Sequence, residues 1–79
     1  MDKLFTLTRD NIMAELVDAD EKFLDHSQRF DRGTVLTIIR PAHAWGNTKG
    51  IEYCTVQIGS NYFNIPTRVL ALSISPKGG

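Results

Sequence analysis

The chain has 79 residues, of which 42% are hydrophobic and 23% are charged, and its nine basic and nine acidic side chains give a formal net charge of zero. This length accommodates one domain, and this composition excludes an intrinsically disordered protein. Charge balance argues against strong binding to the phosphate backbone of nucleic acids. We therefore expect a single domain over residues 1–75, followed by a flexible tail at 76–79.

The beginning of the chain admits two interpretations. Lys3 to Thr8 alternates apolar and polar side chains and predicts a strand. Residues 11–24 carry apolar side chains at helical spacing, which would give an α+β fold. Alternatively, Ile12–Val17 and Phe23–Phe30 pair as a long hairpin that turns at Asp18-Ala19-Asp20. We prefer the hairpin because the remainder of the chain predicts only strands and one helical turn.

The middle of the chain predicts two strands joined by a loop. Thr34–Ile39 is rich in β-branched residues, which favour strands. Pro41 is expected to end this strand, and residues 41–50 form a loop rich in Pro, Gly and Asn. Ile51–Ile58 then alternates, which places Cys54 on an apolar face. A buried cysteine behaves as a small hydrophobic residue, so we do not expect this thiol to be catalytic.

The end of the chain predicts a hairpin, one helical turn and a closing strand. Gly59-Ser60-Asn61 is a short turn signal, and Tyr62–Ile65 returns as a strand. Pro66 to Val69 predicts a single helical turn, because proline suits the first helical position. Leu70–Ile74 alternates as the last strand. The side chains expected in the core are Val35 or Leu36, Val56, Ile58, Phe63, Ile65, Val69 and Leu72.

This order of elements resembles that of SH3-like small barrels. The shared features are a strand after the segment Phe30-Asp31-Arg32-Gly33-Thr34, a tight hairpin, and an Ile-Pro-x-x-Val-Leu segment at residues 65–70 before a short last strand. The resemblance covers residues 28–75 and implies an all-β, five-stranded barrel with a one-turn 3₁₀ helix before the last strand. It implies no particular function, because this architecture is shared by unrelated families.

The candidate binding residues gather around one loop. Trp45 is the only tryptophan, and it lies between cations in a glycine-flanked loop. Aromatic side chains in such loops provide large contact areas at low entropic cost. The predicted binding surface consists of Arg40, His43, Trp45, Lys49, Tyr53, Tyr62 and Arg68. The alternative is that the Trp45 ring folds back as a lid over one end of the barrel.

The sequence contains no recognisable catalytic, cofactor or metal motif. It has no H-x-x-x-H, C-x-x-C or glycine-rich phosphate loop. Asp18 and Asp20 match the opening of a calcium loop, but no glycine stands at its sixth position, and Arg29 occupies the twelfth. We therefore expect an acidic turn there, with no catalytic residue, metal ion or cofactor.

These observations favour a non-catalytic interaction module that binds a macromolecular partner, with a protein preferred over nucleic acid because the net charge is zero. The small size favours an origin in a phage or another mobile element. A lone cysteine and the absence of a signal or membrane-spanning pattern predict a cytoplasmic protein without a membrane partner. Two alternatives are single-stranded nucleic acid binding by stacked aromatic rings and a structural role as a homo-oligomer.

A further alternative is enzymatic. Val56-Gln57-Ile58 is similar to part of a Val-Gln-Ile-Tyr motif of type II plasmid dihydrofolate reductases, which are SH3-like chains whose tetramers form one central active site. Gly59 follows where that family has tyrosine, and Asn64 occupies the topologically matching glutamine position. The resemblance would imply a homo-oligomer that binds a pterin and a nicotinamide cofactor. Because of these two differences, we prefer the interaction module.

Overall fold

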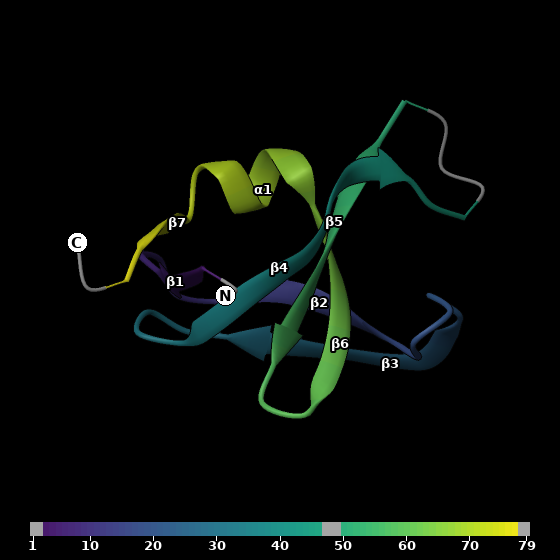
Figure 1. The fold of residues 1–79 in the computed structure, drawn as a ribbon, viewed down its shortest axis with the longest axis horizontal. Helices are drawn as coiled ribbons and strands as arrows, with labels where there is room; N and C mark the ends of the chain where they lie inside the picture. Colours follow the sequence, from purple (N-terminus) through teal and green to yellow (C-terminus); the bar gives the residue numbers. More distant parts are fainter. Residues whose placement is uncertain (1–2, 47–49, 78–79) are drawn as a thin grey trace.

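The computed structural model describes residues 3–46 and 50–77, and within them the chain is all-β, as predicted (Figure 1). The elements are β1 (Leu4–Leu7), β2 (Ile12–Val17), β3 (Phe23–Phe30), β4 (Val35–Ala44), β5 (Glu52–Ile58), β6 (Asn61–Pro66), α1 (Thr67–Ala71) and β7 (Ile74–Pro76). These are seven strands where five were expected. The number five came from the resemblance to SH3-like barrels, whereas the segments predicted along the chain, with both strands of the first hairpin, already number seven.

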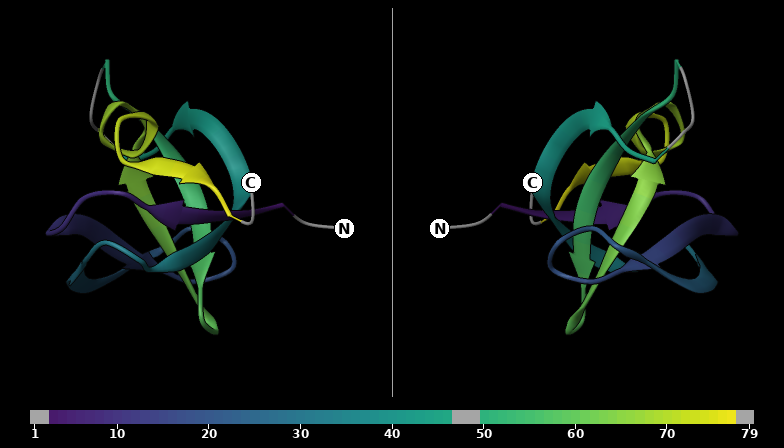
Figure 2. Two further views of the ribbon diagram at one scale, coloured as in Figure 1. Left: turned by 90° about the vertical axis from the view of Figure 1, so that its left-hand side faces the viewer. Right: turned by 90° about the vertical axis from the view of Figure 1, so that its right-hand side faces the viewer.

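The seven strands form one antiparallel sheet in the order β3-β2-β6-β5-β4-β1-β7. Three of the six pairings, β1 with β4, β1 with β7 and β2 with β6, join strands that are not consecutive in the sequence. Figure 2 shows β1 running across the direction of β5 and β6, so the sheet is strongly twisted and curls around its core. The helix α1 connects β6 to β7 and contacts β5 and β6.

The first hairpin has the bounds that the sequence predicts. Ile12 pairs with Phe30 and Val17 pairs with Phe23, so residues 11–24 do not form the alternative helix. The inward side chains of β2 are fully or nearly fully buried, which fixes the strand by its period of two. The register shifts between Glu15 and Val17. This irregularity falls near the turn that carries the candidate site.

The core lies between the inward faces of the curled sheet and α1. Its buried hydrophobic residues are Leu7, Ile12, Ala14, Val17, Leu36, Cys54, Val56, Phe63, Ile65 and Leu70. The predicted burial of Leu36, Val56, Phe63 and Ile65 is confirmed, whereas Ile58 is only partly buried. Cys54 lies on the core face of β5, with its Sγ 3.3 Å from Thr67 Oγ1.

Strand β4 does not end at Pro41, and the predicted loop from residue 41 is therefore wrong for its first part. The strand continues to Ala44, with Arg40 opposite Thr55 and His43 opposite Tyr53. Two residues, 41 and 42, thus lie opposite the single residue Cys54, which is the arrangement of a β-bulge. Proline is tolerated at a bulge because the ladder does not require an N–H there. Because of this bulge, β4 continues past Pro41, where the strand was expected to end.

The predicted closing strand at Leu70–Ile74 is also wrong. Leu70 belongs to α1, which is a five-residue α-helix and not a 3₁₀ turn, with Pro66 as its N-cap residue. Helical spacing buries Leu70 and leaves Val69 and Leu72 exposed, although both were expected in the core. The last strand begins at Ile74 and includes Pro76, which pairs with Phe5. Pro76 and Lys77, both expected in the tail, are thus attached to β1, since the Lys77 N–H donates to the Leu4 carbonyl oxygen at 3.0 Å, and residues 78–79 lie outside the described part of the chain.

The exposed position of Leu72, directly after α1, predicts that its side chain contributes little to stability. Its side chain is 62% exposed, so Leu72→Ala is expected to change the free energy of unfolding by less than about 0.5 kcal/mol. Urea denaturation monitored by circular dichroism measures this change. A loss of about 2 kcal/mol or more would instead support burial of Leu72 in the core, as in the closing-strand interpretation.

Candidate binding surface

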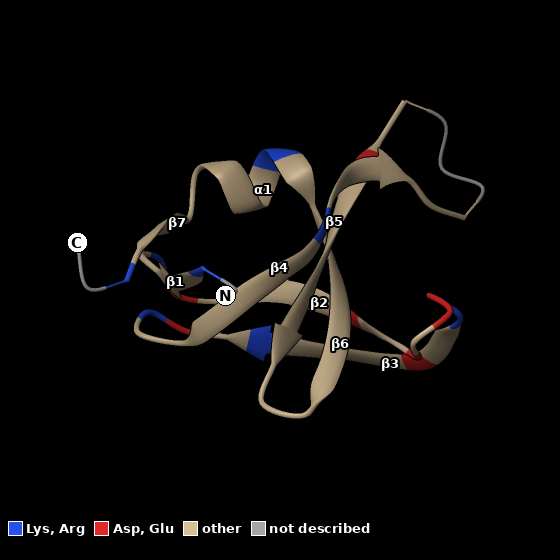
Figure 3. Cartoon of the chain, in the orientation of Figure 1, with Lys and Arg blue, Asp and Glu red and all other residues tan. Residues whose placement is uncertain are grey.

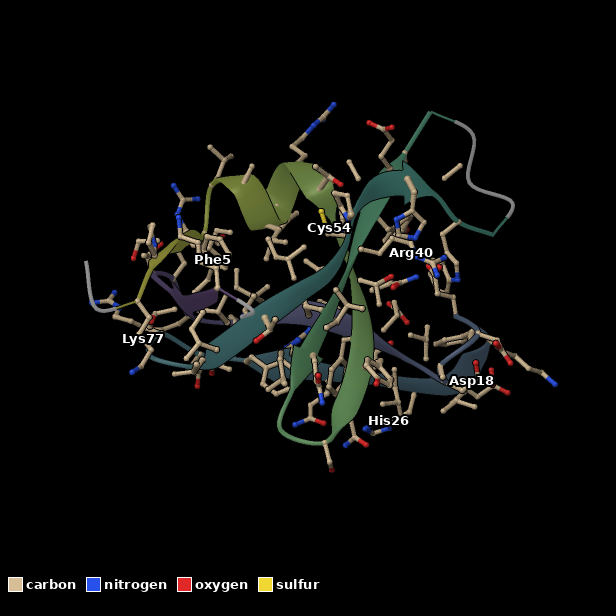
Figure 4. All side chains as sticks on the ribbon, in the orientation of Figure 1. Phe5, Asp18, His26, Arg40, Cys54 and Lys77 are labelled. Carbon is tan, nitrogen blue, oxygen red and sulfur yellow. The ribbon has the colours of Figure 1, made fainter. Side chains whose placement is uncertain are left out.

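Four of the predicted binding residues lie together where β4 and β5 meet the β2–β3 turn. They are Arg40 and His43 on β4, Trp45 directly after it, and Tyr53 on β5. Figure 4 shows Arg40 on the side of β4 that faces this turn, where Asp18 lies.

The other three predicted residues lie elsewhere or are not described. Arg68 is on α1 and lines a pocket together with Tyr53. Tyr62 pairs with Gln57, four residues along β5 from Tyr53 and roughly 13 Å away at ~3.3 Å per residue, so it does not join the cluster. Lys49 lies outside the described residues.

The residue that organises this surface is Glu21, which the sequence analysis treated only as part of an acidic turn. It has a left-handed backbone conformation with φ of 63°, and its side chain is only 10% exposed. The carboxylate pairs with Arg40 Nη1 and with His43 Nε2. It also accepts hydrogen bonds from Thr55 Oγ1 at 3.1 Å and from Asn64 Nδ2 at 3.2 Å. These five residues are called the Glu21 cluster.

His43 lies between two oxygen atoms that can only accept hydrogen bonds. Nδ1 lies 2.7 Å from the carbonyl oxygen of Pro41, and Nε2 contacts Oε1 of Glu21. A ring with protons on both nitrogens can donate to both oxygens at once. The Glu21 cluster is therefore formed by one acidic side chain, the two basic side chains of Arg40 and His43, and two neutral side chains.

The neutral half of the cluster is fully inside the protein. Asn64 is buried completely and Thr55 almost completely, and Thr55 Oγ1 lies 2.7 Å from Asn64 Oδ1. A hydroxyl has one proton, so Thr55 can donate to either Glu21 or Asn64 at one time, while the Asn64 amide donates to Glu21 throughout. The Asn64 side chain thus contacts both Thr55 and Glu21.

The surroundings of Glu21 lower the pKa of its carboxyl group. Burial alone would raise this pKa, because it disfavours the charged form. Hydrogen bonds from His43, Asn64 and Thr55, together with the positive charge of His43, lower it by more. The carboxylate is therefore the stable form over the entire neutral range of pH.

Trp45 covers the Glu21 cluster. Its indole N–H donates to the backbone carbonyl oxygen of Glu21 at 2.7 Å. The ring makes edge-to-face contacts with Tyr53, at a centroid distance of 5.0 Å, and with Phe23, at 6.2 Å. Such contacts are expected if the Trp45 ring folds back onto the protein as a lid. A direct role of the ring in binding a partner stays a prediction.

Two open pockets lie beside Tyr53, which contacts the Trp45 ring, and they share the wall formed by Tyr53, Pro66 and Val69. The larger one, of about 460 Å³, is also lined by residues 50–52 and by Thr67 and Arg68. The smaller one, of about 270 Å³, is also lined by Asn11, Ile12, Met13 and Glu15 of the first hairpin. The two pockets together are called the Tyr53 groove. Exposed apolar side chains of Met13, Ile51 and Val69 lie along it.

Sequence reasoning missed Glu21 because nothing local marks it. Four acids fall within residues 18–25, and Figure 3 shows them gathered at the β2–β3 turn. The available signal was the charge imbalance between the acidic first 32 residues and the basic remainder of the chain. Glu21 and Arg40 come from opposite sides of that division and pair in the structure.

Residues 3–46 and 50–77 contain no group of three His, Cys, Asp or Glu side chains that could hold a metal ion. No helix within these two segments is long and apolar enough to cross a bilayer. A scan against models of protein families, and searches among curated proteins and solved structures, found no match to this chain.

Proposed function

We propose that this protein is a non-catalytic interaction module that binds an apolar segment of a partner protein in the Tyr53 groove. The observation that carries the proposal is the pair of adjoining pockets around Tyr53, Pro66 and Val69. A tyrosine in such a wall offers a large rigid contact area and a polar hydroxyl. Exposed apolar side chains along a groove are typical of interaction sites on small domains.

The charges along the groove favour a protein partner over nucleic acid. Its lining contains two acids, Glu15 and Glu52, and one base, Arg68. A phosphate backbone would meet net repulsion there, whereas binding to nucleic acid generally requires several cations. An apolar peptide segment flanked by basic residues would match both the apolar and the acidic side chains that line this groove.

The proposal predicts that Val69→Glu abolishes binding of such segments without unfolding the protein. Val69 is 38% exposed, so a charge there is tolerated by the fold but would be buried under a bound apolar side chain. Peptides selected from a random library on the wild-type protein are expected to bind Val69→Glu at least about tenfold more weakly, equivalent to ~1.4 kcal/mol. Isothermal titration calorimetry measures the affinity.

Leu72→Glu is the matched control. Leu72 is an exposed apolar residue directly after α1, and it lines neither pocket. Its peptide affinities should equal those of the wild type. Equal binding by wild type and Val69→Glu would place the interaction outside the groove. A labelled single-stranded oligonucleotide, measured by fluorescence anisotropy, is the competing ligand, and submicromolar binding to it would favour the nucleic acid alternative.

A further inference from the structure

The β2–β3 turn is a preformed unit whose internal bonds do not depend on the Glu21 side chain. The side chain of Asp18 accepts hydrogen bonds from the backbone N–H groups of Asp20 at 2.8 Å and Lys22 at 2.9 Å. Backbone bonds also join Asp18 to Lys22 and Glu21 to Asp18. The turn can therefore keep its shape whether or not Glu21 holds its partners on β4, β5 and β6.

Protonation of Glu21 is incompatible with its present partners. A proton on Oε2 would face the Arg40 guanidinium, and a proton on Oε1 would face the N–H groups of His43 and Asn64. Of the four contacting atoms, Arg40 Nη1 and Asn64 Nδ2 can only donate, so the proton would need Thr55 Oγ1, or Nε2 of a neutral His43 ring, as its acceptor. Neutralisation also removes the attraction to both cations, so the turn loses its attachment to β4 while its own hydrogen bonds persist.

The Glu21 cluster is connected to the Tyr53 groove through Trp45. The indole donates to the Glu21 carbonyl oxygen, and the same ring packs edge-to-face on Tyr53, which lines both pockets. Glu21 has a backbone conformation that non-glycine residues adopt rarely, and such strain often accompanies a segment with two arrangements. Displacement of the turn therefore removes the acceptor that orients the Trp45 ring against the groove wall.

We infer that the Glu21 cluster is an acid-sensitive latch that controls the wall of the Tyr53 groove. A proton from solvent binds the Glu21 carboxylate, the turn separates from Arg40 and His43, and Trp45 no longer supports Tyr53. The charged groups that face Glu21 are these two cations from β4, whereas β5 and β6 contribute only neutral side chains. This inference rests on the proposed function for the role of the groove, but the latch itself is measured without a ligand.

The direction of the pH dependence follows from the lowered pKa of Glu21. An unfolded glutamate titrates near about 4.3, so the carboxylate contributes fully to the closed state above that pH. The contribution is lost as the pH falls through the lower pKa of the folded state. The latch is thus closed at neutral pH and opens in acid.

Trp45 reports on the latch directly, because it is the only tryptophan in the sequence. In the wild type, its fluorescence emission is expected to change in acid before the far-ultraviolet circular dichroism does. Nuclear Overhauser contacts between the Trp45 and Tyr53 rings should be present at pH 7 and be lost over the same pH range. Glu21→Gln imitates the protonated acid, so its emission at pH 7 should match that of acid-treated wild type and stay constant with pH.

Two further variants make the test decisive. Asp20→Asn removes an acid from the same turn whose side chain is not in the cluster, and it should titrate like the wild type. His43→Gln removes the imidazole, whose hydrogen bond and charge both lower the Glu21 pKa, so its transition should move to higher pH, which remains measurable if Glu21→Gln does not fold. An emission change that occurs only together with global unfolding, or that persists in Glu21→Gln, would overturn the inference. Failure of peptide binding with an intact latch would count against the proposed function alone.

Discussion

Replacing Phe63 with alanine is expected to cost about 3–5 kcal/mol of unfolding free energy, the typical loss for a large buried aromatic side chain. Phe63 is 2% exposed and packs edge-to-face on Phe30 at a centroid distance of 5.0 Å. It pairs with Val56 on one side and Leu16 on the other, so the cavity would open at the centre of the sheet. Small domains have total stabilities of about 5–15 kcal/mol, so this loss would unfold a large fraction of the molecules.

Chemical denaturation followed by circular dichroism measures the effect. Phe23→Ala is the matched control, because Phe23 is 42% exposed at the start of β3 and its ring contacts only the Trp45 ring among the aromatic contacts of the described residues. Its loss should be near about 1 kcal/mol, the usual size of a partly exposed substitution. Equal losses for the two variants would contradict the position of the core.

Replacing Glu21 with alanine is expected to cost about 2–4 kcal/mol at neutral pH, an unusually large effect for a residue in a turn. The change leaves Arg40 and His43 without their anion and leaves the buried Asn64 amide without its acceptor. Asp20→Ala in the same turn should change stability by less than about 0.5 kcal/mol.

A double-mutant cycle between Glu21→Ala and His43→Ala tests whether the pair acts as a unit. The coupling energy is expected to be about 1–2 kcal/mol at pH 7 and to decrease in acid, because protonated Glu21 no longer attracts the imidazolium. Additive effects at pH 7 would show that the two side chains stabilise the fold independently.

The sequence predicts those parts of the fold that local patterns determine. The strands at Ile12–Val17 and Phe23–Phe30 were predicted with their observed bounds, because the turn signal at Asp18-Ala19-Asp20 separates them and the two segments pair as a hairpin. Pro41 was misinterpreted because a proline ends a regular strand but is accommodated in a bulge, and only the pairing with β5 reveals that bulge. Leu70 to Leu72 fits either a strand or a helix by pattern, and packing of Leu70 against the core decides for the helix.

The candidate site was only partly predictable for a related reason. Arg40, His43, Trp45 and Tyr53 are near one another in the sequence, and their residue types alone mark them as a possible surface. Glu21 reaches them only because the first hairpin pairs with β6, which is a contact between distant parts of the chain. A buried carboxylate with four partners cannot be recognised from neighbours in the sequence when every partner lies on another strand.

The strand order also sets how the chain can fold. The β2–β3, β4–β5 and β5–β6 pairings join consecutive strands, whereas the β1–β4, β1–β7 and β2–β6 pairings close longer loops, so we expect the consecutive pairings to form first. Loop closure over such separations slows folding, and β-rich domains with distant pairings fold on the order of milliseconds to seconds. β1 pairs with both β4 and β7, so one of its edges stays unpaired until β7 is in place.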